Sequence, residues 1–406
     1  MSRLEFVDAS IPTPRPEKAN DTVLDIRGLS VDYGVGQGAV HAVANVDLTV
    51  RRGEVLGIAG ESGSGKSTLV YAITRLLRDP GVIVAGDATF YSRPDAQSTT
   101  RTVDLLSDDK SVIRSVRWSE IAVVFQSALH ALNPVFTIGR LIDDVLAAHE
   151  PSMNKQQRRD RAAELLDMVG ITADRLRSYP HELSGGMRQR VMIALSIALN
   201  PQLLIMDEPT TALDVVIQRE ILEQLMDLRD RFGFTVIFIT HDLSLLIELA
   251  DTIAVMYAGE IVERAPAQAL FRAPRHPYTY GLLNSFPVLH GPRIAMTGIK
   301  GSPPDMRNVP EGCPFHPRCA HAMPECSTDH PPLLRLRDAF GDRDVSCWLQ
   351  DSAHAVPPEL ALDGASASAR VAAATTANVA PTTDAPRPHP ESTTPAHADT
   401  ATEVTA

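Results

Sequence analysis

The segment GESGSGKST, residues 60–68, has the composition of a phosphate-binding loop. It fits the pattern G-x-x-x-x-G-K-[ST] and stands between the apolar run EVLGIA and a helix that we expect to begin at Lys66. Glycines allow backbone N–H groups to converge on phosphate oxygens, and a helix N-terminus favours the same anion. An ordinary Gly/Ser turn is the alternative. The candidate ligands are Gly60, Ser62, Gly63, Gly65, Lys66, Ser67 and Thr68, with Lys66 on the outer phosphates and the Ser67 hydroxyl on Mg²⁺.

Two carboxylates in QLLIMDEP could complete a site for phosphoryl transfer. The apolar run 203–206 predicts a strand that delivers Asp207 at its carboxyl end, where ligands gather in open α/β sheets. Asp207 can hold Mg²⁺ through a water, and Glu208 can orient or deprotonate the attacking water. The alternative is that both carboxylates only cap the strand and solvate a turn.

Two further polar residues end apolar runs. Gln126 closes IAVVFQ and His241 closes TVIFITH. Buried strand ends rarely leave an amide or imidazole unused, so both are candidate catalytic residues, and Gln126 is also a candidate Mg²⁺ ligand. A hydrogen-bonded structural role is the alternative for each.

All four cysteines lie between residues 313 and 347, with the spacing C-x5-C-x6-C-x20-C. The short knuckles that structural zinc sites favour are missing, whereas iron–sulfur clusters accept varied spacing among four thiolates. The spacing therefore leans away from zinc, and an iron–sulfur cluster, a zinc site, and plain thiols or a disulfide all stay open at this point. The expected ligands are Cys313, Cys319, Cys326 and Cys347. The nearby His316, His321 and His330 are expected to be surface or hydrogen-bonding residues.

Alternating strand and helix patterns must position these groups. Short β-branched runs (VLDIRGL, EVLGIAG, IAVVFQ, LLIMDE, TVIFITH, TIAVMYAG) alternate with helical stretches, which predicts an α/β fold with a largely parallel sheet covered on both faces. A helical insertion is expected at about 127–200. We expect a flexible arm at 1–20, a main domain at 21–265, a Cys-containing extension at 266–350 and a disordered Ala/Pro/Thr-rich tail at 351–406.

Composition excludes several classes of protein. With 44% hydrophobic and 22% charged residues, the 406-residue chain is typical of a globular protein, and no apolar run is long enough to span a bilayer. The N-terminus lacks the apolar core of a secretory signal, so we expect a cytoplasmic location and reduced thiols. A net charge of -12 offers no general basic field, so no nucleic-acid partner is expected.

The run LSGGMRQR, followed by the DE-terminated strand, ALD and a strand-ending His, resembles the ATP-binding subunits of ABC transporters over roughly residues 22–265. The resemblance implies a P-loop NTPase (RecA-like) core with antiparallel β and α-helical subdomains, which hydrolyses ATP. It also implies a second ATPase subunit, whose bound ATP is contacted by the signature loop of this chain. In addition, it implies that Asp214 lies at the dimer seam and that Tyr33 stacks on adenine. A simple core role is the alternative for Tyr33. The signature residues are Ser184, Gly185 and Gly186.

The later segments PRHPYTYGLLNSFP, GSPPDM and GCPFHPRC resemble the C-terminal extension of dipeptide and oligopeptide importer ATPases. This implies two membrane permeases, an extracytoplasmic solute-binding protein, a second ATPase and a peripheral position on the cytoplasmic face of the membrane. It also implies a [4Fe–4S] cluster on the four cysteines. Nickel or another solute as cargo, and a soluble regulatory ABC ATPase, are the alternatives.

Overall fold

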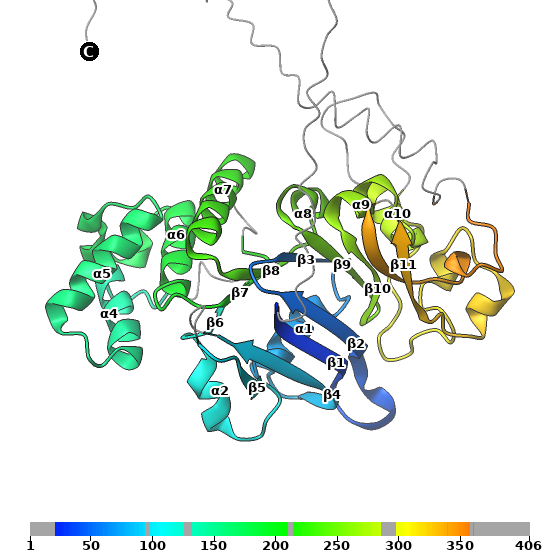
Figure 1. Cartoon of the computed structure of the whole chain (residues 1–406), viewed down its shortest axis with the longest axis horizontal. Helices are drawn as coiled ribbons and strands as arrows, with labels where there is room; N and C mark the ends of the chain where they lie inside the picture. Colours follow the sequence, from blue (N-terminus) through cyan, green and yellow to red (C-terminus); the bar gives the residue numbers. More distant parts are fainter. Residues whose placement is uncertain are drawn as a thin grey trace, which may run out of the picture.

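The computed structural model describes residues 21–93, 98–125, 132–209, 214–285, 298–338, 340–357 and 360. Within these ranges the chain forms an eight-stranded and a four-stranded sheet (Figure 1). The strand order of the larger sheet is β11-β12-β10-β9-β3-β8-β7-β6. The expected arm at 1–20, the residue Gln126 and the tail beyond residue 360 lie outside the described residues.

The larger sheet has a parallel half that carries the motifs. Its neighbouring strands are β9 (Thr252–Tyr257), β3 (Val55–Ala59), β8 (Thr235–Ile239), β7 (Leu203–Asp207) and β6 (Ile121–Val124). Every residue of β3, β7 and β8 is buried. The continuous apolar runs in the sequence follow from this burial, since a strand covered on both faces has no solvent side.

Alternate side chains of β7 enter two different hydrophobic clusters. Leu204 and Met206 pack in the cluster that contains residues of α7 (Val215–Phe232) and α8 (Leu243–Leu249). Leu203 and Ile205 pack in the cluster that contains α1 (Lys66–Ile73) and the smaller sheet. Helices therefore cover one face of the parallel sheet, and α1 with the smaller sheet covers the other. The predicted α/β class is confirmed.

The smaller sheet is antiparallel, with the strand order β2-β1-β4-β5. The run VLDIRGL, which we expected in the parallel sheet, lies instead in β1, so that expectation is wrong. A short apolar run does not reveal which sheet it joins, because only long-range pairing decides it. The strands are β1 (Thr22–Tyr33), β2 (Val40–Arg51), β4 (Gly81–Ser92) and β5 (Arg101–Asp104), and α2 (Lys110–Val116) follows them.

Between β6 and β7 the described residues form helices and no strand. The helix α5 (Lys155–Met168) begins with a capping box, in which Asn154 accepts from the Gln157 backbone and the Gln157 side chain accepts from the Asn154 backbone. The other helices are α4 (Ile138–His149), η2 (Ala173–Arg177), η3 (Pro180–Glu182) and α6 (Gly185–Ser196). Figure 1 shows α4, α5 and α6 together at one end of the molecule.

The C-terminal part of the chain continues the larger sheet. Strand β12 (Gly341–Ser346) pairs antiparallel with β10 (Glu260–Pro266) and with β11 (Leu333–Asp338). The carboxylate of Glu263 is fully buried beside Arg343, whose side chain is also fully buried and pairs with Asp338 at 2.8 Å. The remaining elements are α9 (Ala267–Arg272), α10 (Pro277–Asn284), η4 (His316–Arg318), η5 (Pro324–Ser327) and η6 (Trp348–Gln350).

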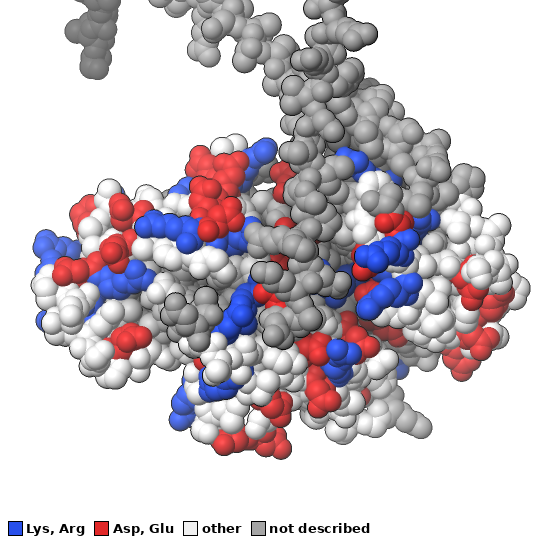
Figure 2. Space-filling view, viewed as in Figure 1, with Lys and Arg blue, Asp and Glu red and all other residues white. Residues whose placement is uncertain are grey.

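The surface carries charges of both signs. Figure 2 shows acidic and basic side chains interspersed over the face that it draws. Among the helices that the structure describes, none is both long and apolar enough to cross a lipid bilayer.

Candidate functional site

The phosphate loop connects β3 to α1 and has a backbone that only glycine accommodates at two positions. Gly60 has φ +151° and Gly65 has φ +101°, and an added Cβ would collide with the carbonyl oxygen of Met256 or of Ala42, respectively. The loop is therefore pressed against neighbouring backbone, which fixes its N–H groups for an anion. The predicted residues Ser62, Gly63 and Thr68 lie in this loop or in the first turn of α1.

The side chain of Lys66 folds over the loop. Its Nζ donates to the carbonyl oxygens of Gly60 at 2.8 Å and Glu61 at 2.9 Å, and it lies 3.5 Å from the Ser64 hydroxyl. Burial lowers the pKa of Lys66, while Glu208 and Asp207 act in the opposite direction. A buried ammonium group held by weak neutral acceptors is suited to exchange them for phosphate oxygens.

Ser67 and Asp207 form a candidate Mg²⁺ site. The Ser67 hydroxyl donates to Oδ1 of Asp207 at 2.9 Å. Asp207 is fully buried, and its Oδ2 has no hydrogen-bond partner in the part of the chain that the structure describes. Burial raises the pKa of Asp207, and the phenol of Tyr71 faces the carboxylate closely enough that burial and this charge raise the pKa of Tyr71 to about 12. A hydroxyl beside an unsatisfied carboxylate oxygen fits a hard divalent cation.

Glu208 and His241 come together at the ends of β7 and β8. Nδ1 of His241 lies 3.4 Å from Oε1 of Glu208. Glu208 has φ +45°, a left-handed conformation that a residue without glycine's freedom rarely adopts, and its N–H donates to the carbonyl of Ile239 at 2.9 Å. Such backbone conformations cluster at functional sites. The third residue of the predicted catalytic group, Gln126, lies outside the described residues.

Tyr33 ends β1 beside the phosphate loop. Its hydroxyl lies 3.5 Å from the Thr68 Oγ1. The half-buried ring packs closely against Gly81, since a Cβ added to this glycine would lie 2.8 Å from Cε1 of Tyr33. The structure thus places this aromatic residue at the edge of the phosphate site, on the smaller sheet.

The signature residues lie at the start of α6, away from the phosphate loop. Ser184 is exposed and caps the helix, since its Oγ accepts from the Met187 N–H at 3.3 Å. Gly185 and Gly186 form the first helical turn, and Gly186 packs against Ile217 of α7. The helix α6 packs against α4, α5, α7 and β6, whereas α1 packs against β1 and β2. Figure 1 shows α6 and α1 in different parts of the molecule.

Asp214 caps α7, with its Oδ1 accepting from the Ile217 N–H at 3.0 Å. The next two residues are apolar and exposed, Val215 by 77% and Val216 by 68%. The start of α7 therefore places a carboxylate and two exposed valines on the surface of the protein.

Three residues that were not predicted as site residues meet at the phosphate loop. Glu61 lies inside the loop, while Tyr278 and Arg318 come from the C-terminal extension. The loop pattern leaves the residue at position 61 undefined, and Glu61 and Arg318 are 257 positions apart. No motif or periodicity could therefore have revealed these contacts.

The four cysteines gather around one pocket, which His276, Phe315 and Trp348 also line. All four are free, and Cys313 donates its N–H to the Cys326 carbonyl at 2.8 Å. Burial raises the pKa of Cys313 and Cys319 to about 11 and that of Cys347 to about 12. In the described ranges, however, no three His, Cys, Asp or Glu side chains are arranged as ligands of a metal ion.

The three histidines expected to be surface or hydrogen-bonding residues, His316, His321 and His330, all make hydrogen bonds to the protein. His316 Nδ1 lies 2.9 Å from the Cys313 carbonyl, and His330 Nε2 lies 2.7 Å from Oε2 of Glu260. The bond with Glu260 raises the pKa of His330. His321 donates its N–H to the Cys319 sulfur at 3.4 Å.

Two family profiles match the chain. The profile described as ABC transporter matches residues 43–211, which include the phosphate loop, the signature residues and both carboxylates. The profile described as the C-terminal region of oligopeptide/dipeptide transporters matches residues 262–326, which include Tyr278, Arg318 and three of the cysteines.

Similar proteins extend over most of the chain. An oligopeptide transport ATP-binding protein, AppD of Bacillus subtilis (strain 168), is 42% identical over 81% of this chain and 97% of its own length. A dipeptide transport ATP-binding protein, DppD of Escherichia coli (strain K12), is 42% identical over 78% of this chain and 94% of its own length. Among solved structures, a dimeric post-hydrolysis state of the ATP-binding cassette MJ0796 with ADP and Pi covers 60% of this chain and 98% of its own, at 28% identity and TM-score 0.52.

Proposed function

The chain belongs to the ATP-binding subunits of ABC transporters in the oligopeptide and dipeptide group, and we propose that it is the motor of a multi-subunit importer. ATP binding draws two nucleotide-binding subunits together, hydrolysis lets them part, and this cycle moves the permeases. The observation that carries the proposal is the convergence of the phosphate loop, buried Asp207 and the Glu208–His241 pair at one sheet edge.

Each residue of the site has a proposed task. The loop N–H groups and Lys66 bind the phosphates. Ser67 and Asp207 would hold Mg²⁺, and Gln126, which lies outside the described residues, is the third proposed ligand. When bound, Mg²⁺ neutralises charge that develops on the phosphates. Glu208 orients the attacking water and accepts its proton, while His241 holds Glu208 in place and faces the terminal phosphate. Tyr33 stacks on the adenine.

We propose that the active form is a dimer of this chain with an identical or homologous ATPase. Ser184, Gly185 and Gly186 would then contact ATP on the partner, and Asp214 would lie at the seam. Three observations support this: Ser184 is exposed, α6 and α1 lie apart in the chain, and Val215 and Val216 are uncovered. A similar cassette of known structure is dimeric with ADP and Pi.

The proposed partners outside the dimer are two transmembrane permeases and, through them, an extracytoplasmic solute-binding protein. The chain would sit peripherally on the cytoplasmic face of the membrane. The unit at 21–265 would carry the ATPase, and the extension at 266–350 would pack against it. Leu360, from the segment 351–406 that was expected to be a disordered tail, is fully buried in one cluster with Val345 and Leu349 of the extension. Dipeptides or oligopeptides are the proposed cargo, because the relatives are named for them.

Reconstitution tests this function. The chain would be combined in proteoliposomes with candidate permeases and a candidate second ATPase, and ATP hydrolysis would be measured with a candidate binding protein loaded with dipeptides or with Ni²⁺. We expect dipeptides to stimulate ATP hydrolysis. When the Lys66→Ala variant replaces the wild-type chain, the rate of hydrolysis should not exceed the rate of the second ATPase alone. Stimulation by Ni²⁺ alone would overturn the peptide assignment. A chain that hydrolyses ATP at one rate with or without permeases, and does not stay with the vesicles, would be a soluble regulator instead.

We also propose that Cys313, Cys319, Cys326 and Cys347 hold a [4Fe–4S] cluster. The donor chemistry supports it, because four free thiols line one pocket and cytoplasmic iron–sulfur sites use four thiolates. The sequence lacks the short Cys knuckles that structural zinc sites favour, which disfavours zinc, whereas iron–sulfur clusters accept varied spacing. Binding would contribute folding free energy to a loop-rich extension, and redox sensing is the alternative role. Iron and acid-labile sulfide in anaerobically purified protein test the cluster, and stoichiometric zinc instead would contradict it.

A further inference from the structure

Glu61 places a negative charge inside a loop that must bind a polyanion. Its backbone is part of the phosphate loop, since Lys66 Nζ donates to the Glu61 carbonyl at 2.9 Å. Left unpaired, the carboxylate would repel a triphosphate at close range and weaken its binding. The fate of this carboxylate therefore matters for nucleotide affinity.

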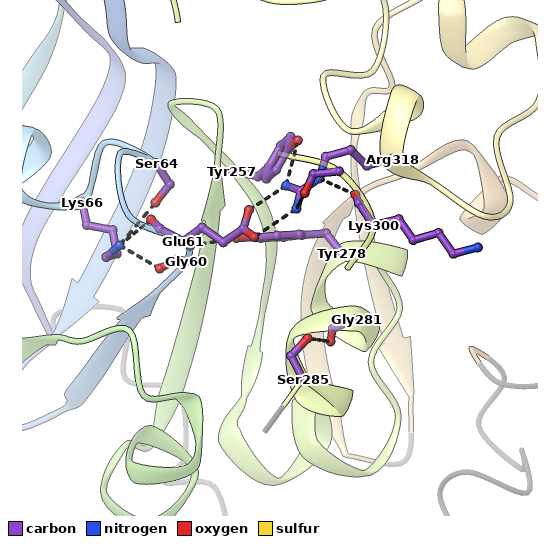
Figure 3. Close-up of polar contacts among 11 residues, drawn as sticks. Gly60, Glu61, Ser64, Lys66, Tyr257, Tyr278, Gly281, Ser285, Lys300 and Arg318 are labelled. Atoms are coloured by element: carbon purple, nitrogen blue, oxygen red, sulfur yellow. Dashed lines mark hydrogen bonds and ion pairs between the residues drawn. The ribbon is translucent and has the colours of Figure 1, made fainter. Parts of the chain in front are cut away.

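Arg318 pairs with Glu61 through a two-pronged contact (Figure 3). Nη1 of Arg318 lies 2.7 Å from Oε2 of Glu61, and Nη2 lies 3.1 Å from Oε1. The Arg318 side chain is only 6% exposed, and its Nε donates to the Lys300 carbonyl at 3.0 Å. Nη1 also lies 3.4 Å from the Tyr257 hydroxyl. A guanidinium held on several sides keeps its fork aligned with the carboxylate.

Tyr278 holds the backbone of the same residue. The Glu61 N–H donates to the Tyr278 hydroxyl oxygen at 2.8 Å. Tyr278 is fully buried, and its ring lies 4.6 Å from the Tyr257 ring and 5.4 Å from the Phe315 ring, measured between centroids. Burial also raises the pKa of Tyr278, so the phenol stays neutral. The C-terminal extension thus fastens Glu61 by its side chain and by its main chain.

We propose that Arg318 and Tyr278 are positioning residues of the phosphate loop: Arg318 neutralises Glu61 and draws its carboxylate away from the triphosphate, and Tyr278 fixes the loop backbone. Neither residue touches nucleotide. This inference rests on the proposed role of residues 60–68 in holding ATP. It makes the cysteine-rich extension part of the nucleotide site, because Arg318 belongs to η4 and directly precedes Cys319.

Rescue of one variant by a second tests the charge argument. The full-length chain, purified anaerobically, would be titrated with Mg²⁺ and the non-hydrolysable analogue AMP-PNP. We expect Arg318→Gln to weaken binding about tenfold, because Glu61 then faces the triphosphate unpaired. We expect Glu61→Gln/Arg318→Gln to return to within about threefold of the wild type, since the repelling charge is gone. The matched control is Arg337→Gln, which removes an exposed arginine of the same extension that pairs with Asp342.

Amide hydrogen exchange over residues 60–65 gives a readout independent of affinity. Tyr278→Phe keeps the buried ring and removes only the acceptor of the Glu61 N–H, so exchange should accelerate there but not in Arg337→Gln. If the double variant binds as weakly as Arg318→Gln, Arg318 acts only through the fold of the extension and the charge role is wrong. Unchanged exchange in Tyr278→Phe would overturn the backbone role. A wild-type chain that fails to bind AMP-PNP would instead contradict the proposed function.

Discussion

Glu208 combines a left-handed backbone with a carboxylate that lies beside His241 at the ends of β7 and β8. Its φ of +45° turns the chain after β7 so that the side chain meets His241. We expect Glu208→Gln to bind ATP as the wild type does and to slow turnover by about 10²–10⁴, the usual contribution of a positioned base. Single-turnover hydrolysis and equilibrium ATP binding, measured on the same preparation, check this. Turnover at the wild-type rate would remove Glu208 from its assigned role.

Asp207 places a buried carboxylate where only one of its oxygens is satisfied. Because burial raises its pKa above that of the unfolded chain, its ionisation opposes folding as the pH rises above the unfolded pKa. We therefore expect Asp207→Asn, which keeps the acceptor for Ser67, to raise the melting temperature at pH 7 by about 2–4 °C without nucleotide. The same variant should raise the Mg²⁺ concentration that gives half-maximal ATP turnover by about 10–100-fold, because one ligand of the ion is lost. At a pH below the usual range for Asp, the two melting temperatures should converge. A less stable variant with normal Mg²⁺ dependence would contradict both arguments.

At the scale of elements, the fit between α6 and α7 fixes where the signature residues stand. A Cβ on Gly186 would lie 2.7 Å from Cγ2 of Ile217, which is closer than real side chains approach. We expect Gly186→Ala to push the two helices apart, at a cost of about 1–3 kcal/mol in the free energy of unfolding. Urea denaturation measures this cost. Gly38→Ala is the matched control, because a Cβ there meets nothing within 4 Å; equal stability of the two variants would show that the contact is not tight.

Some strands and contacts of this fold are predictable from the amino-acid sequence, and others are not. Strands β3, β7 and β8 were predictable because burial on both faces leaves continuous apolar runs, and parallel strands bring Ser67 to Asp207 and Glu208 to His241 at one edge. The assignment of VLDIRGL failed because pairing partners, not local pattern, decide which sheet a run joins. The contact of Glu61 with Arg318 was out of reach, since neither local propensity nor motif spacing describes partners so distant in sequence.

At the scale of the whole molecule, the extension and the ATPase unit share one sheet and a buried charge network. Removing β12 would leave Glu263 buried without Arg343, and an unpaired buried charge is strongly destabilising. We expect a chain that ends at residue 340 to lose cooperative unfolding or to precipitate. A chain that ends at residue 365 should melt within about 1 °C of the full-length protein, since the composition beyond it favours no packed structure. Thermal unfolding of the three chains side by side checks this, and a soluble, cooperative 340-residue chain would contradict it.

The pairing of β12 with β10 also has a consequence for biosynthesis. Glu263 and Arg264 reach the ribosome exit long before Val345 and Asp344, their partners across the sheet. The nascent protein therefore displays an open β-edge for most of the time in which its C-terminal third is translated. Chaperones that shield such edges, or a slow codon stretch that keeps the chain tethered, would act on this protein during that interval rather than after release.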